Sequence, residues 1–219
     1  MSFRPPPAEP LRVPGPAGAL QALLEEPPPE SGQEGPRAGF GVVCHPHPLH
    51  GGTMTNKVVH MVARALQEQG LPTLRFNFRG VGGSDGQYDE GSGEIADALA
   101  VVAFGRARWP RAPLTLAGFS FGAMVALLAA PQALPSRLIT VAPAVSNARY
   151  AQVRQPPCPW LIVQGDADEL VDYRAVSAFA ARFSPPPTLR LLPGVNHFFN
   201  GRLPELRDAV LQFKPSPAA

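Results

Sequence analysis

Cysteine is scarce in this sequence. The 219 residues contain two, Cys44 and Cys158, and each stands beside an apolar run. Two thiols are too few for the disulfide framework on which small secreted proteins depend, and both read as buried thiols. We therefore expect no disulfide scaffold and a cytoplasmic location.

Long apolar segments and basic runs are also missing. No stretch is long enough to span a bilayer, and the first seven residues lack the apolar core of a signal peptide. The formal net charge is only +2, and no run of Lys and Arg occurs. Such a chain has no strong field to attract nucleic acid or a membrane surface, so we expect neither as a partner.

Proline and glycine, by contrast, are abundant. The chain has 28 prolines and 21 glycines scattered between apolar runs, and they predict many turns rather than disorder. Hydrophobic residues make up 45% of the sequence, and charged residues 16%, as in an ordinary globular protein. A chain of this length can bury one substantial core, so we expect residues 1–219 to form a single domain.

Apolar runs alternate with segments of helical spacing from residue 40 onward. The runs within residues 9–26 are separated by turn residues and predict an antiparallel hairpin, followed by a loop over 27–37. The strands expected after it are 40–44, 71–78, 114–117, 138–142, 160–163 and 188–192. The helices expected are 56–69, 95–104, 124–130 with its end at Pro131, 175–183 and 203–213. This alternation favours a mainly parallel sheet with helices on both faces.

Residues 118–122 read Gly-Phe-Ser-Phe-Gly and stand between an expected strand and an expected helix. A serine at so abrupt a turn is lifted clear of the sheet, and the flanking glycines remove Cβ atoms that would collide. The pattern is typical of a nucleophile elbow centred on Ser120. A Gly/Ser loop that merely caps a helix reads the same way, so the interpretation depends on an acid and a base elsewhere.

An acid and a base follow at the right places. In an open parallel sheet the site lies at the carboxyl ends of the strands; Asp168 follows the strand at 160–163, and His197 follows the strand at 188–192. No other histidine lies after Ser120. Three further acids compete with Asp168 for the same role: Asp166, Glu169 and Asp172.

This ordered set of motifs resembles the α/β-hydrolases, and more narrowly the small lidless bacterial serine hydrolases of the dienelactone hydrolase-like and esterase-like kind. The matching residues are 45–48 (His-Pro-His-Pro), 51–52 (Gly-Gly), 77–82, 118–122, the spacing Gly165-x-x-Asp168-x-x-Val171, and His197. The resemblance implies one α/β-hydrolase domain with about eight strands, mainly parallel. It also selects Asp168 as the acid. Many relatives have Asp where this chain has Asn77, which leaves the partner of Arg79 open.

Acyl-transfer chemistry assigns a role to each residue. Ser120 is a weak nucleophile and needs His197 as its base, and Asp168 orients the imidazole and stabilises its cation. The developing oxyanion needs backbone N–H donors, one of which is that of Phe121. By its position in similar hydrolases His47 is the second, with Leu49 as the alternative.

Two other motifs in the sequence suggest different functions. His45, His47 and His50 resemble a zinc cluster, but no later Asp or His pattern completes it. Residues 80–85 hint at a dinucleotide loop, but Asp85 stands at the third glycine position and the fingerprint fails. We therefore expect neither a metal nor an organic cofactor.

The interval 143–159 has 17 residues, too few for the helical cap that many α/β-hydrolases insert there. An open site shields its intermediate poorly from water, which favours hydrolysis over transfer. The sequence thus predicts a serine hydrolase that cleaves an ester-like bond of a small molecule through an acyl-enzyme on Ser120. A hydrolase of short peptides or acyl thioesters and a non-catalytic binding relative are the alternatives. Five aromatic residues are candidates for lining the site or for packing: Tyr88, Phe119, Phe121, Tyr150 and Phe198.

Overall fold

The computed structural model describes residues 8–27 and 39–214. The first seven residues and most of the loop expected at 27–37 lie outside this part of the chain. Within the described part, no helix is long and apolar enough to cross a membrane.

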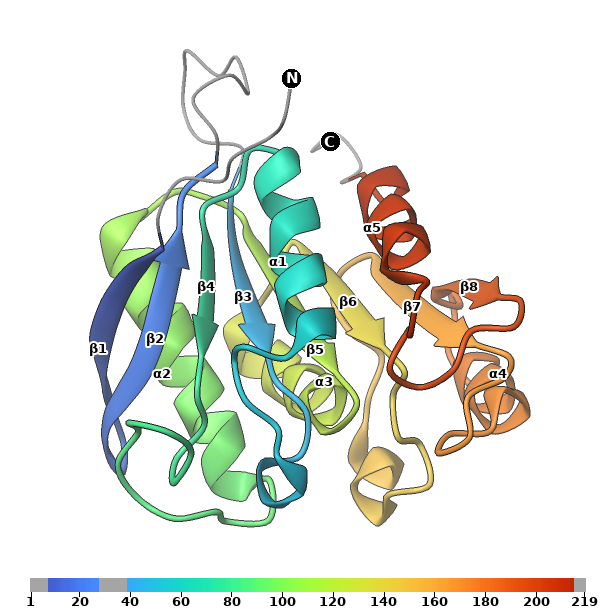
Figure 1. Ribbon diagram of the computed structural model, residues 1–219, viewed down its shortest axis with the longest axis horizontal. Helices are drawn as coiled ribbons and strands as arrows, with labels where there is room; N and C mark the ends of the chain where they lie inside the picture. Colours follow the sequence, from blue (N-terminus) through green and yellow to red (C-terminus); the bar gives the residue numbers. More distant parts are fainter. Residues whose placement is uncertain (1–7, 28–38, 215–219) are drawn as a thin grey trace.

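One eight-stranded sheet runs through the described residues (Figure 1). Its strands are β1 (Glu9–Gly15), β2 (Gly18–Glu25), β3 (Phe40–Cys44), β4 (Thr73–Phe76), β5 (Leu114–Phe119), β6 (Arg137–Val141), β7 (Trp160–Gly165) and β8 (Thr188–Leu192). They lie in the order β1-β2-β4-β3-β5-β6-β7-β8. Strands β3 to β8 are parallel, whereas β2 pairs antiparallel with both β1 and β4. The expected fold class, a mainly parallel sheet with an N-terminal hairpin, is confirmed.

The central strands are buried on both faces. Every residue of β3, β4, β5, β6 and β7 is buried, which explains why these strands read as continuous apolar runs rather than alternating ones. The edge strand β8 is largely exposed.

Helices cover both faces of the sheet (Figure 1). They are α1 (Lys57–Glu68), α2 (Ser92–Arg108), α3 (Phe121–Ala133), α4 (Tyr173–Ala180) and α5 (Leu203–Gln212). Helices α1 and α5 pack against one face, and α2, α3 and α4 pack against the other. Two short 3-10 helices, η2 (Pro48–His50) and η3 (Ala148–Gln152), lie in loops that follow β3 and β6.

Two helices extend beyond their expected ends. Helix α2 begins at Ser92 because the buried Glu94 carboxylate accepts the backbone N–H groups of Asp89 and Gly91, at 2.9 and 2.7 Å. The expectation that α3 ends at Pro131 is wrong, since the helix continues to Ala133. Pro131 lies in the last turn, where its missing N–H removes a single bond, and the N–H of Leu134 closes the turn on Ala130.

The connection between β6 and β7 holds only η3 and loops. In the part of the chain that the structure describes, no cap domain stands over the carboxyl edge of the sheet, as the short interval predicts.

Candidate active site

Ser120 lies at a strained turn between β5 and α3. Its φ of 55° and ψ of −114° are unfavourable for a residue with a side chain, and such strain is held by the surrounding structure. A Cβ at Gly118 would overlap the carbonyl oxygen of Gly122, and one at Gly122 would overlap that of Cys44. Both flanking glycines are therefore required, as the sequence predicts, and they let the turn present the Ser120 hydroxyl at the carboxyl edge of the sheet.

The structure brings Ser120, Asp168 and His197 together from three separate loops. His197 Nε2 lies 3.2 Å from Ser120 Oγ, and His197 Nδ1 lies 2.8 Å from Asp168 Oδ2. The side chains of His197 and Asp168 are 4% and 0% exposed. A neutral imidazole that donates from Nδ1 to Asp168 keeps the lone pair of Nε2 for the serine proton.

The Asp168 carboxylate is ionised and fixed in place. Burial alone would raise its pKa, but the hydrogen bond and electrostatic attraction of the His197 ring and two backbone N–H donors outweigh burial, and its pKa lies below the ordinary value. Those donors are Leu170 and Val171, which reach Oδ1 at 2.9 and 2.8 Å. One oxygen is thus held by the loop while the other faces the imidazole.

The loop after β3 folds over the start of α3. His47 O accepts the N–H groups of His50 and Gly52, and the rings of His47 and Phe121 lie 4.9 Å apart. Among the described residues, neither the His47 N–H nor the Phe121 N–H has a hydrogen-bond acceptor. The N–H of Leu49, the alternative oxyanion donor, is in contrast already used, because it donates to His47 Nδ1 at 3.3 Å.

Comparison with known proteins identifies the family to which the chain belongs. A family model described as "Serine aminopeptidase, S33" matches residues 47–157. The chain is 40% identical to XC6422 from Xanthomonas campestris, described as an α/β serine hydrolase without a lid; the match covers 100% of both chains with a TM-score of 0.89. The chain belongs to this family of α/β serine hydrolases.

Two further proteins are similar to this chain over most of its length. An α/β serine hydrolase homologue from Coxiella burnetii is 43% identical over 97% of this chain and 99% of its own, with a TM-score of 0.86. The uncharacterised protein RP471 of Rickettsia prowazekii (strain Madrid E) is 35% identical over 80% of this chain and 78% of its own.

The acids that compete with Asp168 hold other groups in this serine hydrolase. Asp166 accepts a backbone N–H of the loop after β8, at 2.6 Å, and Asp172 caps the start of α4. Glu169 Oε2 accepts the backbone N–H of His197 at 3.2 Å. Of the four carboxylates, that of Asp168 alone meets the imidazole.

Gln164 was missed by reading the sequence. It lies in β7, it is fully buried, and its Nε2 donates to Asp168 Oδ2 at 3.0 Å. The same oxygen accepts from His197, so the amide fixes the plane of the carboxylate. Its own Oε1 is buried and has no partner among the described residues. The one signal in the sequence that could have identified Gln164 is its position near the end of the strand, four residues before Asp168.

The three histidines of the loop after β3 do not form a common site. His45 Nδ1 lies 2.6 Å from Pro46 O, and Nε2 accepts the N–H of Phe78 at 3.0 Å, so backbone contacts occupy both nitrogens. Burial lowers the pKa of His45 to about 4, and the ring is neutral at pH 7. His47 instead stacks on His50 at 4.3 Å. No set of metal ligands is found in residues 8–27 and 39–214.

The loop at 80–85 serves the fold. Asp85 Oδ2 accepts the backbone N–H of Ala19 in the hairpin at 2.7 Å. Arg79, whose partner the sequence left open, pairs with Asp97 of α2 at 2.8 Å. Asn77 instead accepts the N–H of Met54. Asp97 could not be predicted as a partner because it lies on a different element, 18 residues away.

The five candidate aromatic residues separate into two groups. Phe119 and Tyr150 are buried, and the Phe119 ring packs against the His197 ring at 5.1 Å. Phe121 and Tyr88 flank the His47 ring at 4.9 and 5.2 Å. Phe198 stands perpendicular to the His197 ring at 5.1 Å and is 40% exposed.

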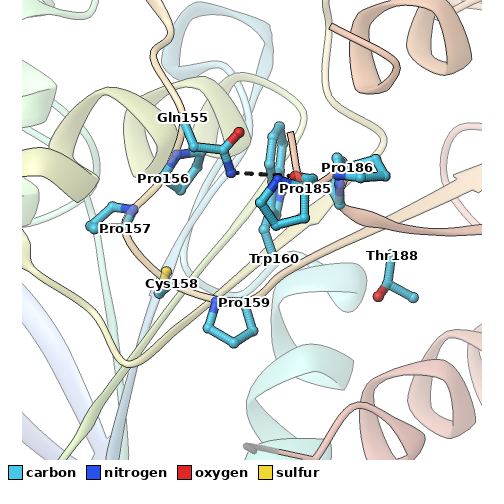
Figure 2. Close-up of a pocket in the computed structure, with 10 residues that line it drawn as sticks. Gln155, Pro156, Pro157, Cys158, Pro159, Trp160, Pro185, Pro186 and Thr188 are labelled. Atoms are coloured by element: carbon cyan, nitrogen blue, oxygen red, sulfur yellow. Dashed lines mark hydrogen bonds between the residues drawn. The ribbon is translucent and has the colours of Figure 1, made fainter. Parts of the chain in front are cut away.

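A pocket of about 480 Å³ lies at the other edge of the sheet (Figure 2). It is lined by prolines and by Trp160 and Thr188, the first residues of β7 and β8, so it is remote from the carboxyl ends that carry Ser120. Cys158 is its one thiol, and burial raises the pKa of that thiol to about 11. A protonated thiol is a poor nucleophile, so this pocket does not compete with Ser120.

Proposed function

We propose that this serine hydrolase cleaves a carboxylic ester of a small molecule through an acyl-enzyme on Ser120. The observation that carries the proposal is the continuous contact from Asp168 Oδ2 to His197 Nδ1, at 2.8 Å, and from His197 Nε2 to Ser120 Oγ, at 3.2 Å. This is the geometry that a hydroxyl nucleophile, its base and an orienting acid need.

The first half of the reaction forms the acyl-enzyme. His197 Nε2 takes the proton of Ser120 as Oγ attacks the ester carbonyl, and the Asp168 carboxylate stabilises the imidazolium. The negative charge on the carbonyl oxygen is met by the free N–H of Phe121, at the start of α3, and by that of His47. His197 then gives its proton to the departing alcohol oxygen.

The second half uses water. With the alcohol gone, a water molecule occupies its place, gives a proton to His197 and attacks the acyl carbon. The acid departs, and the proton returns from His197 to Ser120. The absence of a cap over the edge of the sheet supports hydrolysis, because water reaches the acyl-enzyme freely.

Short peptides are the second candidate substrate class. The family model that matches residues 47–157 is described as a serine aminopeptidase, and the same three side chains serve amide cleavage. A panel of p-nitrophenyl esters, aminoacyl substrates and acyl-coenzyme A esters separates the classes. We expect the highest kcat/KM with the esters.

The nucleophile is tested with a fluorophosphonate probe, which reacts with activated serines. We expect the probe to label the protein at Ser120 and the Ser120→Ala variant to remain unlabelled. Ser146, an exposed serine beyond β6, provides the matched control, and Ser146→Ala should label like the wild type. Undiminished labelling of Ser120→Ala would exclude the mechanism. A folded wild type that neither labels nor turns over any ester would favour the binding protein instead.

A further inference from the structure

Exposed apolar side chains concentrate on the loops that carry the site. Among the described residues five large hydrophobic side chains are exposed: Leu49, Leu134, Leu170, Leu191 and Phe198. Leu49 lies in the loop after β3, Leu170 follows Asp168 by two residues, and Phe198 follows His197 directly. Single exposed hydrophobics are ordinary on protein surfaces, but three on the site loops indicate a surface that meets an apolar ligand.

The proton path determines which part of an ester meets Leu170 and Phe198. His197 must deliver its proton to the leaving oxygen, so the leaving group lies on the His197 side of the reacting carbonyl. The Phe198 ring stands 5.1 Å from the His197 ring. The Leu170 N–H is bound to Asp168, and Glu169 between them accepts the N–H of His197, so the two loops are joined here. Phe198 therefore lies on the leaving-group side of the site, and Leu170 lies on the loop that is joined to it.

The charges on these two loops disfavour an anionic leaving group. Asp166 and Glu169 each use one oxygen to hold the His197 loop, and both residues are exposed. Asp172 at the start of α4 adds a third exposed carboxylate. The cations nearby are Lys57, which binds Asn200, and Arg174, which lies over the Tyr173 ring. Arg202 also donates to Pro193 O of the His197 loop, but its charge is paired with that of Glu205. A phosphorylated thiol such as coenzyme A would meet more negative than positive charge here.

We propose that Leu170 and Phe198 form the alcohol subsite of this hydrolase and that its substrates are esters of neutral, apolar alcohols. The proposal rests on the proposed ester hydrolysis at Ser120. Complete burial of one methylene group improves binding about fourfold, and an open surface supplies about half of that free energy, or about twofold per methylene.

The test varies the alcohol and keeps the acyl group constant. Acetate esters of ethanol, butanol and hexanol are hydrolysed below their solubility limits, and acid release is followed by titration at constant pH. We expect kcat/KM to rise about twofold per methylene, mainly through KM, since all three esters form the same acetyl-enzyme. Acetyl-coenzyme A and acetylcholine complete the panel. Hexyl acetate should be a better substrate than acetyl-coenzyme A through both charge and apolar contact, and better than acetylcholine through apolar contact alone.

Variants locate the subsite. Leu170→Ala and Phe198→Ala should flatten the dependence of kcat/KM on chain length, with the largest loss for hexyl acetate and the smallest for ethyl acetate. Phe198→Leu, which stays apolar, should keep part of the slope and controls for a displaced His197 ring. Leu134→Ala is the matched control, because Leu134 and Leu170 are both 62% exposed and Leu134 lies at the far end of α3, about 20 Å from Ser120.

Failure of the subsite and failure of the proposed function give different results. A flat series in the wild type, an unchanged slope in both alanine variants, or a preference for acetyl-coenzyme A or acetylcholine would overturn the subsite while the fluorophosphonate still labels Ser120. Loss of labelling together with no hydrolysis of any ester would overturn the proposed function and the subsite with it.

Discussion

At the residue scale, the acid–base pair depends on a side chain outside the three predicted residues. Gln164 donates to the Asp168 oxygen that accepts from His197, and it does so from a fully buried position in β7. A hydrogen bond to a charged group contributes about 1.5–3 kcal/mol. We infer that Gln164 positions the carboxylate rather than contacting the substrate.

Replacement of Gln164 by Leu tests this role. Without the amide donor the Asp168 carboxylate is less firmly oriented and its charge acts more strongly on His197. We expect kcat to fall about tenfold with little change in KM, and the acid limb of kcat/KM to move to higher pH.

The control for this variant is Gln67→Leu. Gln67 is also buried, on α1, and its Nε2 has no partner among the described residues. Its loss should leave the pH profile unchanged. A Gln164→Leu enzyme with the wild-type profile would show that the amide serves packing alone.

His45 makes stability depend on pH. The folded pKa of His45 is about 4 because burial disfavours the cation, whereas the ordinary value is 6.5. Between these values the unfolded chain binds more protons than the folded one, so the free energy of unfolding falls as the pH falls.

We expect His45 to remove about 2 kcal/mol of stability between pH 7 and pH 5, by the difference between its folded and unfolded titrations. Urea unfolding at both pH values measures the loss. His45→Gln should be less stable than the wild type at pH 7 and should lose about 2 kcal/mol less over the same interval. Equal losses in the two proteins would contradict the assignment.

At the scale of elements, a buried arginine joins the ends of two helices. Arg137, the first residue of β6, is 2% exposed; burial lowers its pKa to about 10, so it remains charged at pH 7. Its guanidinium donates to Phe213 O at the end of α5, to the Gln69 side chain at the end of α1, and to Thr115 Oγ1 in β5. A cation at two helix C-termini is favoured by both helix dipoles.

Arg137→Met should lower the free energy of unfolding by about 2–4 kcal/mol, because the buried Thr115 Oγ1 and two half-buried acceptors lose their donor. Activity per folded molecule should stay unchanged, since the contacts lie at the amino edge of the sheet. Arg207→Met removes an ion pair with Glu68 that joins the same two helices at the surface, and it should lose at most about 1 kcal/mol. Equal losses of stability in the two variants would show that the burial of Arg137 contributes nothing.

The elements differ in how far the sequence predicts them. Every expected strand and helix exists, because continuous apolar runs and helical spacing are local signals of burial. The ends of the helices depend on signals that are less local. The start of α2 depends on a capping carboxylate, and the end of α3 lies beyond a proline that costs only one bond in its last turn.

At the scale of the whole molecule, the sheet assembles a site from loops far apart in the sequence. Parallel strands bring their carboxyl ends to one edge, so the order of the motifs predicted that Ser120 and His197 meet an acid there, and the family resemblance selected Asp168 among four candidates. The contacts that support these three residues could not be predicted from the sequence, because the pairing of His45 with Phe78 or of Arg79 with Asp97 depends on packing between elements. The open edge above the site follows from the short connection between β6 and β7.

The central claim is that an acyl group passes through Ser120, and detection of that acyl-enzyme is the most direct test. The protein is mixed with a short-chain p-nitrophenyl ester, quenched in acid within the first turnovers, digested and analysed by mass spectrometry. The account predicts one added acyl group on the peptide that carries Ser120, absent from the Ser120→Ala variant. Rapid ester turnover with this peptide unmodified, and with Ser120→Ala as active as the wild type, would contradict it.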